Sequence, residues 1–220
     1  MLALKYTRTL AKPLRWQGVR SIFIDTESTP NPHSMKFLPG KEVLPEESGT
    51  GIHFEKASMS ARDAVKSPLA KVLFGVQGVK GVFLARDFIT VTKEADEVWP
   101  VLKPQLFSHI LDFMSSGQDV IAAGGEEHVS DTTILDTDDE IVAAIKELLE
   151  SRIRPAVQED GGDIYYRGFD ESNGMVSVEL AGSCVGCPSS SATLRGGVEN
   201  MLKHYVPEVK GIIEINEVCE

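Results

Sequence analysis

Two cysteines three positions apart are the residues of this chain best suited to chemistry. Cys184 and Cys187 enclose a Val-Gly pair, and they lie between the alternating run 175–180 and the Pro-Ser-Ser-Ser run 188–191. Thiolates at this spacing can hold one metal centre together or form one disulfide. The remaining cysteine, Cys219, is next to the C-terminal residue, and we expect it to be a free thiol.

The residues around the pair favour the thiolate form. A helix is predicted to begin at Pro188, because proline is favoured at the first helical position. Both sulfurs would then lie at the positive end of the helix dipole, near backbone N–H groups that the helix leaves unpaired. Gly182 and Gly186 leave room for backbone amides to approach the sulfurs or a bulky inorganic centre. The thiolate is the form that binds metal.

A structural zinc ion is the first of three uses that the pair could have. Such a site takes four protein ligands, but the next histidine, His204, is 17 positions beyond Cys187 on the same predicted helix. At about 1.5 Å per residue it would lie roughly 25 Å away along the axis. The other histidines show no ligand spacing: His33, His53, His109 and His128. A closed zinc site within one chain is therefore disfavoured.

Thiol–disulfide exchange is the second use. Thioredoxin-like proteins also place a Cys-x-x-Cys motif after a strand and at a helix start. Here only 33 residues follow Cys187, and the only proline among them after Pro188 is Pro207, at the exit of the predicted helix. This leaves little chain for the rest of such a fold and no proline in a strand opposite the thiols. A thiol–disulfide oxidoreductase stays open as the alternative function.

An iron–sulfur cluster is the third use. Cubane clusters are usually held by four thiolates, and the motif of one chain offers two. Two chains that meet at Cys184 and Cys187 would supply all four. A cluster shared in this way on a loop is easily released, which suits transfer to another protein better than permanent electron carriage.

The length of 220 residues suits two domains of about 100 residues each. We expect an α+β protein, with two small α/β domains joined by a flexible acidic linker. The expected boundaries are a first domain at 25–115, a linker at 116–137 and a second domain at 138–220. Glycine, serine and acidic residues replace periodic apolar residues in the linker, so the two halves should be independent.

The first domain should combine short strands with two helices. Runs rich in β-branched and aromatic residues predict strands near 35–38, 52–54, 79–84 and 88–92. A short helix is predicted over 68–74, with Pro68 at its favoured first position. Another is predicted over 99–114, where Pro104 should mark its start or a bend.

The second domain should have the order α-β-β-α-β, with a three-stranded sheet covered on one face by two helices. Apolar residues at helical spacing predict a first helix over 141–153, capped by Asp138 or Asp139 and weakened at Pro155. The other predicted elements are strands at 163–167, 175–180 and 211–216 and a helix that ends near 205.

Several residues of the second domain have a structural interpretation. Gly196 and Gly197 indicate either tight packing on the sheet or close approach of a partner chain. Asp160 and Asp163 are interpreted as turn and cap residues. Since the sequence shows no nucleophile–base set and no phosphate loop, we expect no enzyme activity. Five side chains of the last helix are assigned to the core by their spacing: Leu194, Val198, Met201, Leu202 and Tyr205.

Charge is unevenly distributed along the chain. The formal net charge is −11, yet residues 1–24 contain five basic residues and no acidic residue. A leader of this kind predicts a mitochondrial transit peptide. The remaining residues carry 17 basic against 33 acidic side chains, which argues against nucleic acid as a partner. No apolar stretch approaches the roughly 18 residues that cross a bilayer, so we expect no membrane span.

Two sets of motifs resemble one family. The run Asp-Gly-Gly-Asp at 160–163, the run 180–190 around Cys184 and Cys187, and Thr193-Leu194 resemble the NifU C-terminal type of domain found in the Nfu family. Thr-Pro-Asn-Pro at 29–32 and Lys36-Phe37 resemble the additional N-terminal domain of mitochondrial Nfu proteins.

This resemblance implies a function as well as a fold. It implies a scaffold or carrier that receives a [4Fe-4S] cluster from upstream cluster-assembly proteins in the mitochondrial matrix. Cys184 and Cys187 would bind the cluster between two chains, as a homodimer or higher oligomer. The cluster would then pass to apo iron–sulfur clients, of which lipoyl synthase and respiratory-chain subunits are the usual ones.

Overall fold

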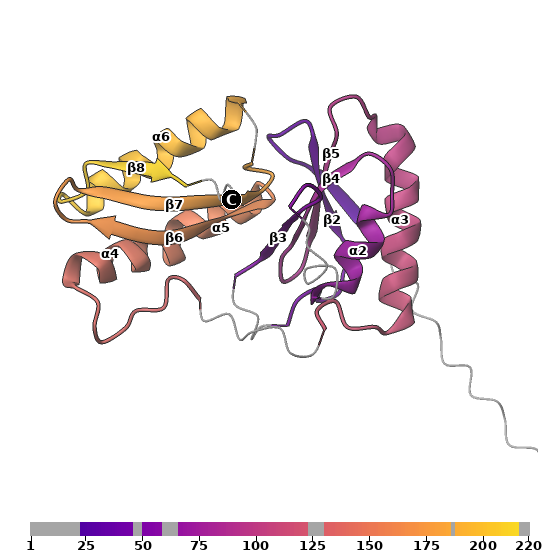
Figure 1. Cartoon of the computed structure of the whole chain (residues 1–220), viewed down its shortest axis with the longest axis horizontal. Coiled ribbons are helices and arrows are strands. Elements are labelled where there is room, and N and C mark those ends of the chain that lie inside the picture. The colour runs from indigo at the N-terminus through magenta and orange to yellow at the C-terminus, as the bar shows by residue number, and fades with distance from the viewer. Residues whose placement is uncertain (1–22, 46–49, 59–65, 123–129, 186–187, 216–220) are drawn as a thin grey trace, which may run out of the picture.

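The computed structural model describes residues 23–45, 50–58, 66–122, 130–185 and 188–215, with the side chains of 188–192 left aside. Most of the predicted leader, together with Cys187 and Cys219, lies outside these ranges. The described chain forms two sheets with helices packed on them (Figure 1). The expected α+β class, with two α/β halves, is confirmed.

The first half is built on a five-stranded antiparallel sheet with the order β1-β2-β5-β4-β3. Its two helices lie on the side of this sheet that faces away from the second half (Figure 1). Contrary to one expectation, the long helix α3 runs through Pro104 from a start at Trp99. The strands are β1 Asp25–Ser28, β2 Ser34–Leu38, β3 Ile52–Glu55, β4 Val79–Leu84 and β5 Ile89–Lys93, and the helices are α2 Pro68–Phe74 and α3 Trp99–Ser116.

The second half follows the predicted order, and its sheet has the order β6-β7-β8. The pair β6–β7 is antiparallel and the pair β7–β8 is parallel. Val176, Val178 and Ile164 on one face of the sheet share a single apolar core with residues from both helical segments. The helices are α4 Glu140–Leu148, the π-helical segment Leu149–Ile153, α5 Arg154–Glu159 and α6 Pro188–Tyr205, and the strands are β6 Gly162–Asp170, β7 Met175–Gly182 and β8 Gly211–Glu214.

The predicted weak point in the first helix of this half is visible as a π-helical turn, Leu149–Ile153, directly before Arg154-Pro155. Proline has no N–H to donate back into the helix, so the hydrogen-bond pattern widens before it. Asp139 occupies the N-cap position, as expected, but its side chain makes no capping hydrogen bond. The neighbouring Asp138 instead accepts hydrogen bonds from Leu135 N and from Lys146 Nζ.

The core prediction for α6 needs one correction. Val198 and Leu202 are buried, and Leu194 and Met201 pack against the same core. Tyr205 is 51% exposed. It is the last residue of α6, and its ring lies against the guanidinium of Arg152, 5.1 Å from the ring centre. Helical spacing selected the correct face of the helix, but the core ends before its last residue.

The stretch expected to be a linker contacts both halves at its ends. Ser67 Oγ donates to Val120 O over 2.9 Å at the start of α2. Further along, Asp131 Oδ1 accepts from Arg154 Nη2 over 2.7 Å, and Lys146 Nζ donates to Thr133 O over 3.1 Å. Residues 118–122 therefore pack with the first half and residues 130–138 with the second.

The two halves are packed against each other, although the sequence suggested independent units. Figure 1 shows the first sheet meeting the end of β7. Tyr165 Oη donates to Gly51 O over 2.7 Å, and Gly51 N donates to Asp163 Oδ2 over 3.3 Å. A small apolar cluster joins the halves, with Phe83, Ala85, Phe88 and Leu38 from one side and Tyr165 and Ala181 from the other.

Candidate functional site

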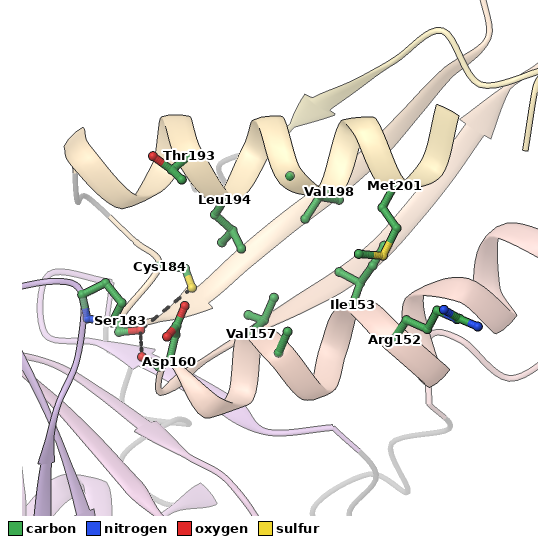
Figure 2. Close-up of a pocket in the computed structure, with 13 residues that line it drawn as sticks. Arg152, Ile153, Val157, Asp160, Ser183, Cys184, Thr193, Leu194, Val198 and Met201 are labelled. Atoms are coloured by element: carbon green, nitrogen blue, oxygen red, sulfur yellow. Dashed lines mark hydrogen bonds between the residues drawn. The ribbon is translucent and has the colours of Figure 1, made fainter. Parts of the chain in front are cut away.

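Cys184 lies two residues beyond the end of β7 and is only 4% exposed. Its neighbour Ser183 ties the loop to the turn before β6, because Ser183 N donates to Gly161 O over 3.2 Å and Ser183 Oγ donates to Asp160 O over 2.6 Å. The same hydroxyl lies 3.9 Å from Cys184 Sγ (Figure 2). The structure thus places the first of the two predicted ligands, while Cys187 lies outside the described residues.

Two turns that contain glycine pack against each other and against Cys184. Gly161 and Gly182 both have left-handed backbone conformations, with φ of +81° and +66°. A Cβ on Gly182 would lie 2.7 Å from Gly161 O, and one on Gly162 would lie 2.5 Å from Cys184 Sγ. Only glycine permits this approach of backbone to backbone and of backbone to sulfur. The sequence suggested that Gly182 lets backbone amides approach the sulfurs; the structure shows that Gly182 allows the loop to pack onto the turn at Gly161.

The helix after the motif begins where it was predicted. The helix α6 starts at Pro188, so three residues separate Cys184 from its first residue. The first backbone N–H groups of a helix have no partner within the helix and carry partial positive charge. The cysteine loop therefore ends at a site that favours negatively charged groups, such as a thiolate or an anionic cluster.

An apolar cavity of about 450 Å³ opens beside Cys184. Figure 2 shows Leu194 and Val198 of α6 directed toward Val157 and Ile153 across this cavity, with Cys184 at one end. Most of this lining is apolar, and the polar lining residues Asp160 and Ser183 lie at the end of the cavity that holds Cys184. The cavity therefore offers an apolar space directly beside the thiol.

Gly196 and Gly197 lie on α6 beside this cavity, and Gly197 lines it. Among the described residues, and apart from the backbone of α6 itself, no atom lies within 4 Å of a Cβ built on either glycine. Tight packing on the sheet, one of the two interpretations of this pair, is therefore wrong. Glycine in a helix interior costs up to about 1 kcal/mol relative to alanine, and the described structure gives no packing reason for that cost.

Three residues of the first half hold the backbone around Cys184. The side-chain amide of Asn31 donates to Ser183 O over 3.0 Å and to Val185 O over 3.4 Å. Thr90 Oγ1 donates to Gly161 O over 2.7 Å, and His53 Nδ1 accepts from the N–H of the residue at the end of β7 over 3.3 Å. Sequence reasoning missed all three as site residues. Asn31 appeared only within the family motif at 29–32, with no role at the cysteines, and the other two residues lie in ordinary strands.

A buried ion-pair network fixes the start of β6. Arg154 Nε donates to Asp163 Oδ1 over 3.1 Å, and the guanidinium also bonds to Asp131 and Glu150. Burial raises the pKa of Asp163, and the charge of Arg154 opposes that rise. Burial acts to lower the pKa of Arg154, but the carboxylates of Asp163, Asp131 and Glu150 together raise it. Asp163, interpreted from sequence as a turn residue, is instead a fully buried partner of this network.

Among the described residues, a set that leaves out Cys187, no three His, Cys, Asp or Glu side chains gather into a metal-binding group. Within the same part of the chain, no helix has the length and apolar character needed to cross a membrane.

Comparisons with known proteins match both halves of the chain. The family described as "Scaffold protein Nfu/NifU N terminal" matches residues 24–117, and the family described as "NifU-like domain" matches residues 145–213. "NifU-like protein 5, mitochondrial" of Arabidopsis thaliana is 49% identical over 207 residues, which cover 94% of this chain and 73% of the relative. The human "NFU1 iron-sulfur cluster scaffold homolog, mitochondrial" is 49% identical over 201 residues, covering 91% of this chain and 74% of the relative.

Among solved structures, the solution structure of a NifU-like protein from Saccharomyces cerevisiae aligns with a TM-score of 0.42 and 25% identity. The alignment covers 56% of this chain and 99% of that one.

Proposed function

The chain belongs to the Nfu family of iron–sulfur cluster scaffold proteins, and we propose that it is itself a scaffold that carries a cluster as cargo. The observation that supports this most directly is the setting of Cys184. Its thiol is held against a glycine turn, close to the start of α6 and at the end of an apolar cavity. That setting suits a ligand for a bulky, negatively charged inorganic group.

We infer that the cargo is a [4Fe-4S] cluster held by Cys184 and Cys187 from each of two chains. A cubane takes four thiolates, and the motif supplies two of them per chain. The protein would therefore form a homodimer or a higher oligomer when it is loaded. Gly196 and Gly197, which have open space in place of a packing partner, lie on the helix that follows the motif and offer a surface for the second copy.

Thiol–disulfide exchange fits the described part of the site less well. The attacking sulfur in such a reaction must be an accessible thiolate. Cys184 is almost fully buried, at 4% exposed, and the cavity beside it is lined mostly by apolar side chains. We infer a role in binding and transfer, without enzymatic turnover.

The leader and the relatives support a location for this function. Residues 1–24 have the composition of a mitochondrial transit peptide, and the relatives from Arabidopsis thaliana and Homo sapiens are named mitochondrial. We propose that the protein acts in the mitochondrial matrix. It would receive its cluster from upstream assembly proteins and deliver it to apoproteins such as lipoyl synthase and respiratory-chain subunits.

Anaerobic reconstitution with iron and sulfide tests the proposal. The loaded protein should contain about four iron and four sulfide per two chains, and loading should convert monomer to dimer in a native mass measurement. Cys184→Ser or Cys187→Ser should abolish both effects together, and Cys219→Ser should leave both intact. A monomer with a complete cubane, or a dependence on Cys219, would contradict the bridging arrangement.

A further inference from the structure

We propose that Asn31, in the first half of the chain, is a positioning residue for the cysteine loop in the second half, and that it controls how readily the loop releases its cluster. The effect on release rests on the proposed function. The effect on the loop itself does not, and it can be measured without a cluster.

The contacts of Asn31 span the cysteine. Its Nδ2 donates to Ser183 O over 3.0 Å and to Val185 O over 3.4 Å, so one amide group contacts carbonyls on both sides of Cys184. Val185 is also the first residue between the two cysteines. A displacement of this loop therefore has to break or stretch the hydrogen bonds to Asn31. Since Asn31 is 2% exposed, water cannot easily replace them.

Asn31 is itself held in place by its own turn. Its Oδ1 accepts from His33 N over 3.0 Å, and its main-chain oxygen accepts from Thr29 Oγ1 over 2.8 Å and from Ser34 N over 3.0 Å. The next residue is anchored as well, because Trp99 Nε1 donates to Pro32 O over 3.1 Å. The hydrogen bond from His33 N to the side chain of Asn31 makes an Asx turn, which fixes the asparagine side chain in one orientation. The amide is thus presented to the cysteine loop by a rigid part of the first half.

Neighbouring contacts hold the backbone beneath the loop in the same way. Thr90 donates to Gly161 O, and His53 accepts from Gly182 N. Asn31 reaches further than these two, past Cys184 and into the segment between the cysteines. Separation of the two halves would release all these contacts together, so docking of the first half and retention of the cluster should be coupled.

The substitution Asn31→Asp tests this role with little change in shape. The variant keeps Oδ1, which accepts from His33 N, but it replaces the donor Nδ2 with an oxygen that faces Ser183 O and Val185 O. A useful control is Tyr165→Phe, which removes another hydrogen bond between the halves, to Gly51 O over 2.7 Å. Asn31→Ser, too short to reach the loop, serves as a second variant in case Asn31→Asp does not fold.

The first measurement needs no cluster. In the full chain with Cys187→Ser and Cys219→Ser, Cys184 remains as the single thiol, and its rate of reaction with a maleimide reports opening of the loop. In Asn31→Asp both hydrogen bonds to the loop are lost, and the new carboxylate oxygen repels the two carbonyl oxygens. We therefore expect the variant to react about tenfold faster or more. Tyr165→Phe should change the rate less than about threefold at matched thermal stability.

The second measurement follows cluster loss to an iron chelator from the reconstituted full chain, by visible absorbance. Faster loss in Asn31→Asp than in Tyr165→Phe, together with the faster thiol reaction, supports the proposal. A faster thiol reaction in a protein that takes up no cluster would support the positioning role and defeat the proposed function. If the protein holds a cluster but Asn31→Asp changes neither rate, or changes both no more than Tyr165→Phe does, the positioning role of Asn31 is wrong.

Discussion

A single methyl group added at Gly162 should show how strictly the turn beneath Cys184 positions the thiol. A Cβ at this position would lie 2.5 Å from Cys184 Sγ and 2.7 Å from Ala181 O. Carbon atoms do not approach sulfur or oxygen this closely without displacing them. Gly162 itself does not have a left-handed conformation, so the backbone tolerates alanine there and the collision alone sets the cost.

The size of the effect follows from what can move. Ala181 lies in β7, paired with Asp163 of β6, so its carbonyl cannot turn away without breaking the strand pair. The sulfur is therefore the atom that shifts. Overpacking of this kind costs about 1–3 kcal/mol. For a chain of this length each kcal/mol lowers the melting temperature by about 2–4 °C, so Gly162→Ala should melt roughly 2–12 °C lower than the wild type.

Thermal unfolding by circular dichroism and iron content after reconstitution measure the two consequences. Gly196→Ala is the matched control for the melting measurement, because its Cβ would enter open space among the described residues around the helix. That change should raise stability by up to about 1 kcal/mol. The reasoning would be refuted if Gly162→Ala melted with the wild type and bound the same amount of iron. It would also fail if Gly196→Ala were as destabilising as Gly162→Ala.

Two further predictions concern charged residues. Arg154→Met should destabilise the protein by about 3–5 kcal/mol in thermal unfolding, because it leaves the buried carboxylate of Asp163 without its cationic partner; a loss below about 1 kcal/mol would contradict this reasoning. Hydrogen bonds from Leu135 N and from Lys146 lower the pKa of Asp138 below its ordinary value of 3.8. The ionised Asp138 side chain therefore stabilises the fold above pH 3.8, and this contribution is lost as the pH falls through the lowered pKa. Asp138→Asn should accordingly melt below the wild type at pH 7, and this difference should shrink as the pH falls below 3.8 and through the lowered pKa. A difference that stays constant over this range would contradict the prediction.

Local patterns in the sequence determined most of the elements of the second half. Alternation along 175–180 predicted β7, in which Val176 and Val178 are buried. A proline after the cysteines predicted the start of α6 at Pro188, and Pro155 predicted the disturbance that appears as a π-helical turn. These features depend on residues within a few positions of one another, so short-range rules were sufficient. The motif around Cys184 was recognisable for the same reason.

Only the tertiary structure decided what surrounds Cys184. Asn31 reaches Ser183 across 152 positions of sequence, and no periodicity connects a turn residue in one half to a loop carbonyl in the other. Asp163 appeared to be a turn residue until packing buried it against Arg154. The need for glycine at position 162 could not be predicted from local sequence either. The sequence neighbours of Gly162 predict a turn, but the need for glycine comes from a sulfur 22 residues later, brought to it by the antiparallel pairing of β6 and β7. The sequence predicted Cys184 as a ligand, and the packing of the two halves decided how that residue is held.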